Sequence, residues 1–229
     1  MRSVTGCLLL CAFAAPVAAA ELGAWPPKAT FADGTELAAT GNVAYDYNDF
    51  SDDARLQDDD AIRRREFGAT LKKKGVYDAM VYYDFANETW LDVFARVETK
   101  ALFGTDVGRI RVGYIKTPVG LDAVTSSRAG SFLETALPVQ AFYEGRRTGV
   151  EWSIERPQYF LQAGAYGGKD LHGDNPGTTQ AVRGVWTPVK AAGDVLHLGL
   201  APSVENPRGW TDGRGTHFDP RARLRARPE

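Results

Sequence analysis

The chain has 229 residues, of which 44% are hydrophobic and 24% charged, and its formal net charge at pH 7 is −2. This composition is that of an ordinary folded protein, so it excludes a chain that is disordered throughout. The balance of charges excludes a uniformly basic surface, and we expect no nucleic-acid partner.

The N-terminus has the pattern of an export signal. Arg2 precedes an apolar run from Cys7 to Ala14, and small residues follow as far as Ala20. This pattern predicts a signal peptide over residues 1–20, removed after Ala20. A buried helix or a membrane anchor is the alternative, but the apolar run is too short to span a bilayer. Because both cysteines lie in the signal, we expect the mature chain to fold without disulfides.

An N-terminal segment at residues 21–36 leads into a region, 37–229, in which apolar and polar residues alternate. At its start Val43 and Tyr45 face one side, while Asn42 and Asp46 face the other. The same period of two, interrupted by turns rich in Gly, Pro, Asp and Asn, predicts about nine or ten strands. Nine of them are placed at residues 37–48, 62–73, 76–85, 90–99, 108–117, 147–155, 159–167, 180–187 and 195–204.

These strands have the length that a membrane requires. After residue 20 no apolar run is long enough for a membrane-spanning helix, so a membrane could be crossed only by strands. Most of the predicted strands have about nine to eleven residues, which matches a tilted strand in a bilayer. Tyr and Trp cluster near strand ends, as at membrane interfaces, although half-buried strands of other proteins also use aromatics. Together these features favour an all-β fold, an antiparallel transmembrane β-barrel of the outer membrane.

A long connection at about residues 118–144 interrupts the series of strands. It contains apolar anchors and a short helical piece from about Ser131 to Leu137, which Pro138 is expected to end. Connections of this length in compact proteins tend to be functional or disordered. We expect this one to be ordered and to fold against the inside of the β-structure.

Several segments of the chain have the order and spacing of one protein family of Gram-negative outer membranes. They are Arg63-Arg64-Arg65, Tyr82-Tyr83-Asp84-Phe85-Ala86-Asn87, Gly108-Arg109-Ile110-Arg111-Val112-Gly113, Lys116-Thr117-Pro118, Thr125-Ser126-Ser127, Gly145-Arg146-Arg147-Thr148-Gly149, Val185-Trp186-Thr187-Pro188, Val195-Leu196-His197-Leu198-Gly199 and Arg225-Ala226-Arg227-Pro228-Glu229. Through these segments the chain resembles the phosphate-selective porin O and P family over most of its mature length.

The resemblance implies a sixteen-stranded barrel that forms a homotrimer and whose third long loop, here residues 118–144, folds into the pore. It implies an outer-membrane porin that is surrounded by lipid and passes anions such as phosphate or polyphosphate. The chain has only about nine or ten strands and no aromatic residue at its end. We therefore expect an N-terminal part of such a barrel, truncated at the C-terminus, because an unclosed sheet leaves backbone groups unpaired in lipid.

Alternation also predicts which charges face the pore, since the opposite face of each strand must be apolar. It assigns five arginines to the lumen: Arg64, Arg96, Arg109, Arg111 and Arg183. Four more cations bracket the long connection and are assigned to the constriction: Lys116, Arg128, Arg146 and Arg147. Guanidinium groups match phosphate oxygens, so these residues are predicted to line the pore and bind anions. Acids on the same face could instead pair with them, and this alternative stays open: Asp46, Asp92, Glu98 and Glu151.

Two other functions stay open at this point. The chain could be a secreted or periplasmic β-sheet protein that binds a ligand, or a non-functional remnant of a truncated porin. Enzymatic activity, a cofactor and a metal site are not expected, because His172, His197 and His217 are isolated and no catalytic or phosphate-loop motif is present.

Overall fold

The computed structural model describes residues 17–21, 26–50, 59–126, 129, 135–142, 145–169 and 176–220. Almost all of its regular structure is β-strand. The strands are β1 (Val17–Glu21), β2 (Lys28–Phe31), β3 (Thr35–Asn48), β4 (Asp59–Lys73), β5 (Tyr77–Asp84), β6 (Thr89–Glu98), β7 (Arg109–Lys116), β8 (Arg146–Arg156), β9 (Tyr159–Lys169), β10 (Pro176–Ala191), β11 (Asp194–Leu200), β12 (Ser203–Pro207), β13 (Trp210–Thr211) and β14 (His217–Phe218). The helices are short: α1 (Thr99–Phe103), α2 (Leu121–Val124) and α3 (Leu137–Phe142).

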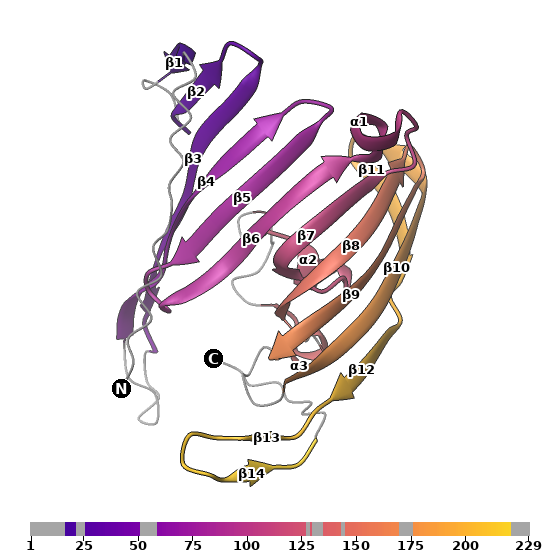
Figure 1. Cartoon of the computed structure of the whole chain (residues 1–229). Coiled ribbons are helices and arrows are strands. Elements are labelled where there is room, and N and C mark those ends of the chain that lie inside the picture. The colour runs from indigo at the N-terminus through magenta and orange to yellow at the C-terminus, as the bar shows by residue number, and fades with distance from the viewer. Residues whose placement is uncertain are drawn as a thin grey trace.

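The strands form one antiparallel meander in which each strand from β1 to β11 pairs with the next. Figure 1 shows this sheet as a curved wall, with α2 and α3 on its concave side. The prediction of an all-β antiparallel fold is confirmed. Within the described residues the sheet is open, because the path of paired strands ends at β1 and β11 without joining them.

Eight of the nine placed strands agree with the observed ones and the last does not, and the structure adds β1, β2, β13 and β14, which were not predicted. The strand expected at 195–204 is divided into β11 and β12 at Ala201 and Pro202. Pro202 has no N–H to donate to the ladder, but its carbonyl oxygen accepts a bond of 3.0 Å from Val182. As a result β11 and β12 both pair with the long strand β10, one along each half of it.

The end predicted for the helical piece in the long connection was wrong. Pro138 was expected to end a helical piece, but α3 begins at Leu137 and includes Pro138 in its first turn. The first turn tolerates proline because its N–H groups have no partner within the helix. Residues 131–134, in the earlier part of the predicted piece, lie outside the described residues.

The two faces of the sheet differ in an unusual way. On the convex face large apolar side chains are exposed, including Val112 at 50% and Leu200 at 75%. On the concave face several charged side chains are buried, such as Glu66 at 4% and Glu151 at 3% exposure. A small apolar cluster of Ile115, Tyr166 and Ala181 is also buried. In the part of the chain that the structure describes, no helix has the length and apolar character to span a membrane.

Candidate functional site

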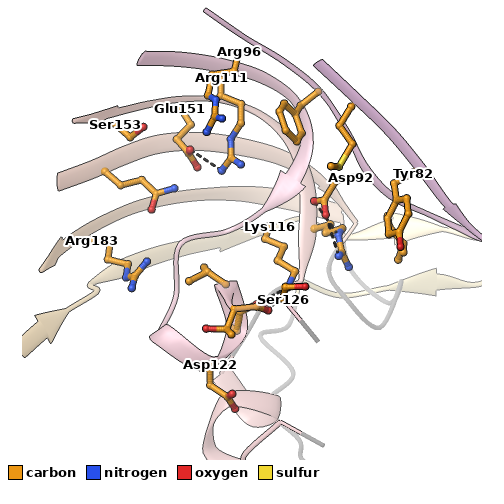
Figure 2. Close-up of a pocket in the computed structure, with 18 of the residues that line it drawn as sticks. Tyr82, Asp92, Arg96, Arg111, Lys116, Asp122, Ser126, Glu151, Ser153 and Arg183 are labelled. Atoms are coloured by element: carbon orange, nitrogen blue, oxygen red, sulfur yellow. Dashed lines mark hydrogen bonds and ion pairs between the residues drawn. The ribbon is translucent and has the colours of Figure 1, made fainter. Parts of the chain in front are cut away.

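The concave face of the sheet and the segment that carries α2 enclose a cavity of about 640 Å³. Seven cationic side chains line it: Arg64, Arg96, Arg109, Arg111, Lys116, Arg146 and Arg183. Figure 2 shows Arg96, Arg111, Glu151 and Ser153 on the wall of the sheet, with Ser126 and Asp122 on the segment that faces it.

The register of the strands places these charges in rows across the wall. In one row Arg96 lies beside Arg111, and Arg111 lies beside Glu151. In the adjacent row Arg109 is followed by Ser153, Gln162 and Arg183 on successive strands. Side chains alternate between the faces of a strand, so residues two apart project into the same space. The cavity is therefore lined by rows of donors that come from five neighbouring strands, β6 to β10.

Most of the arginines are paired with carboxylates. The nitrogen-to-oxygen distances are 3.0 Å for Arg64 and Glu66, 2.7 Å for Arg96 and Asp78, 3.2 Å for Arg109 and Glu98, 2.7 Å for Arg111 and Glu151, and 3.2 Å for Arg146 and Asp92. Of the acids that the sequence offered as partners, Asp92, Glu98 and Glu151 pair with predicted site residues. Asp46 pairs with Arg63 instead, at 3.4 Å.

Two cations of the cavity have no carboxylate partner among the described residues. Arg183 lies over the ring of Phe160, with its guanidinium carbon 5.7 Å from the ring centroid. Lys116 donates hydrogen bonds to the carbonyl oxygens of Ala123 at 2.9 Å and Thr125 at 3.1 Å. Lys116 therefore holds the α2 segment inside the wall, whereas Arg183 keeps its donors for the cavity.

The remaining predicted residues lie elsewhere. Arg147 does not line the cavity: its side chain is 2% exposed and pairs with Glu205 at 3.1 Å. Arg128 lies outside the described residues. Arg147 is the second residue of β8, just after the long connection, and it is bound to β12 through Glu205.

Comparison with known protein families identifies the family of this chain. The sequence model of the family described as phosphate-selective porin O and P matches residues 37–229. The chain belongs to this family. No curated protein and no solved structure gives a significant match to it. The family is one of outer-membrane porins and not of enzymes.

The charge of the porin's cavity is close to balanced. Among the described residues its lining holds seven cations and five carboxylates, the latter being Glu66, Asp92, Asp122, Glu151 and Glu155. Asp78 and Glu98 approach from its margin and pair with Arg96 and Arg109. Any preference for one sign of charge must then come from the placement of individual groups and not from net charge.

Sequence reasoning missed several polar groups of this wall. Gln162 and Ser153 share a row with two predicted arginines, and the buried Glu66 binds a third. Tyr82 and Tyr166 donate to carboxylates of the same face. Alternation alone could have assigned all five to this face, but their burial and their partners follow from the pairing of strands.

Proposed function

We propose that this porin forms an anion-preferring diffusion channel in the outer membrane, with phosphate or polyphosphate as the class of solute. The apolar side chains of the convex face support contact with lipid, because apolar groups need no hydrogen-bond partner in hydrocarbon. The concave face, with its arginine rows, supports a water-filled lumen. Assembly as a homotrimer is part of this proposal and rests on family membership alone.

The observation that carries the anion preference is Arg183. It is the lumen arginine that no carboxylate in the described chain neutralises, and Gln162 and Ser153 lie beside it in the same row. A guanidinium fork with neighbouring amide and hydroxyl donors suits the oxygens of a phosphate-like anion. The paired arginines Arg64, Arg96, Arg109 and Arg111 add oriented donors, since a carboxylate occupies only part of each guanidinium.

The inserted segment supports the role of a constriction. Thr117 closes its base, because its N–H and its hydroxyl both donate to the carbonyl oxygen of Gly145, at 3.0 and 3.2 Å. Asp122 joins its two helical parts by accepting from the N–H of Ala136 at 2.9 Å. With Lys116 bound to α2, these contacts fix the segment in front of the arginine rows.

The test is the reversal potential of the channel in planar bilayers under a salt gradient, with the parent expected to prefer anions. Arg183→Gln should lower the anion-to-cation permeability ratio by up to about fivefold, because unit charges 4 Å apart interact by about 1 kcal/mol in water. Arg109→Ala/Arg111→Ala should lower it further, since Glu98 and Glu151 would lose their partners.

Two neighbouring arginines provide the matched control. Arg64 faces the cavity, whereas Arg65 pairs in register with the exposed Val43 of the convex face. Arg65→Gln removes the same charge from the other side of the wall and should leave the reversal potential unchanged, while Arg64→Gln should shift it. A cation-selective parent, or equal effects of the two substitutions, contradicts the proposal.

A further inference from the structure

Two buried glutamates of the wall are held in the same way. Glu66 receives Arg64 on Oε1 at 3.0 Å and the hydroxyl of Tyr82 on Oε2 at 3.0 Å. Glu151 receives Arg111 on Oε1 at 2.7 Å and the hydroxyl of Tyr166 on Oε2 at 2.8 Å. The amide of Asn42 also approaches Oε2 of Glu66, at 3.4 Å.

Glycines make room for both tyrosine rings. Tyr82 lies opposite Gly68, where an added Cβ would come within 2.7 Å of the ring. Tyr166 lies opposite Gly149, where an added Cβ would come within 2.5 Å of the ring. The rings thus lie against the backbone of the wall and are themselves buried, at 8% and 3% exposure. Each hydroxyl reaches the glutamate from the side, along the sheet.

The two sites are not copies of one repeat. Gly68 follows Glu66 by two residues in β4, whereas Gly149 precedes Glu151 by two residues in β8. The tyrosines therefore approach their carboxylates from opposite directions along the wall. An arginine, a glutamate and a tyrosine thus occur together twice in different arrangements, which indicates that both sites need a carboxylate held by these two donors.

We propose that Tyr82 and Tyr166 are positioning residues that fix the lumen arginines Arg64 and Arg111 through these carboxylates, a role that rests on the proposed channel function. An ionised carboxylate can accept a bidentate fork from arginine. Each tyrosine occupies one oxygen, so the arginine binds the other and keeps donors for an anion in the cavity. Without the tyrosine hydroxyl the carboxylate takes both donors of the fork, and the guanidinium turns away from the solute.

The test is substitution of the hydroxyl alone, by Tyr166→Phe and Tyr82→Phe. Neither changes any charge or the ring that covers the glycine. Loss of one hydrogen bond should raise the phosphate concentration that half-saturates conductance by about two- to fivefold and lower the anion-to-cation permeability ratio. Tyr45→Phe is the matched control, because Tyr45 donates to Asp60 at 2.7 Å from the convex face and is exposed.

A measurement that needs no channel activity separates this inference from the proposed function. In a double-mutant cycle of Tyr166→Phe and Arg111→Met, followed by urea unfolding in detergent, the two changes should be non-additive because one carboxylate binds both side chains. Gly164→Ala should weaken the same coupling, since its Cβ would come within 2.3 Å of the Tyr166 hydroxyl.

The outcomes are distinct. Additive effects overturn the positioning role whatever the channel conducts. Non-additive effects with an unchanged phosphate dependence in an anion-selective channel also overturn it, because the tyrosines then serve stability alone. Non-additive effects in a parent that is cation-selective contradict the proposed function but support the link from tyrosine to arginine.

Discussion

The buried pair of Arg147 and Glu205 leads to an asymmetric prediction. Arg147 on β8 reaches past β9 and β10 to Glu205 on β12, with Nη2 and Oε2 3.1 Å apart. The Nε and Nη1 atoms of Arg147 are buried without a hydrogen-bond partner among the described residues. Glu205 also accepts from the hydroxyl of Thr179, and its side chain is 21% exposed. The buried guanidinium thus depends on Glu205 for its counter-charge, whereas the Glu205 carboxylate can also be hydrated and can accept from Thr179.

The two single substitutions should therefore differ in cost. Glu205→Gln leaves a guanidinium of 2% exposure without a counter-charge, which should cost about 3 kcal/mol, the lower end for a broken buried pair. Arg147→Met keeps the apolar stem and leaves Glu205 partly hydrated, so it should cost about 1 kcal/mol, as for exposed pairs. The double variant Arg147→Met/Glu205→Leu should unfold close to the parent, because it removes both charges.

The assay is urea unfolding of the detergent-solubilised protein, monitored by tryptophan fluorescence. The free energies of unfolding are compared with one shared value for their dependence on urea concentration. A difference of about 2 kcal/mol between the single variants corresponds to a factor of about thirty in the unfolding equilibrium. Equal losses, or a larger loss for Arg147→Met, would refute the argument that burial makes the arginine the dependent partner. A double variant as unstable as Glu205→Gln would show that the lost contacts are packing and not charge.

Three further predictions concern the backbone, the outer face and a turn. Gly113→Ala should destabilise the protein by about 1–3 kcal/mol, because Gly113 has φ +146° and an added Cβ would lie 2.2 Å from the carbonyl oxygen of Val93; an unfolding midpoint equal to the parent's would contradict this. Val112→Arg puts a charge on the convex face and should cost about 2–4 kcal/mol if that face meets the bilayer midplane. Refolding of the parent and the variant into lipid vesicles would measure this cost, and equal refolding yields would contradict the prediction. Hydrogen bonds from the backbone N–H of Thr35 and, to a lesser extent, from the side chain of Lys73 lower the pKa of Asp33 from 3.8 to about 2. The stabilisation from the Asp33 carboxylate should therefore be complete above pH 4 and lost as the pH falls through about 2. NMR titration of this carboxyl group would measure its pKa, and an unshifted pKa would contradict the prediction.

Much of the fold could be read from the sequence because the side-chain period of a strand is local. Val112 and Arg111 fall on opposite faces by alternation alone, and short turns between strands then impose an antiparallel meander. The face of Arg183 followed in the same way, from its neighbour Val182, which is exposed on the convex side. The position of α3 could not be read so surely, because proline is compatible with both the end of one helix and the first turn of the next.

What each charge does was decided only by tertiary structure. Arg183 and Arg147 have the same chemistry and were both predicted to line the pore. Arg183 faces the cavity without a carboxylate partner in the part of the chain that the structure describes, whereas Arg147 is buried against Glu205. The difference depends on register and on what packs against each end of the wall. Alternation fixes the face on which a side chain lies, because it is a property of one strand. Its partner, its burial and the electrostatic interaction left for a solute depend on residues from other strands, which only folding brings together.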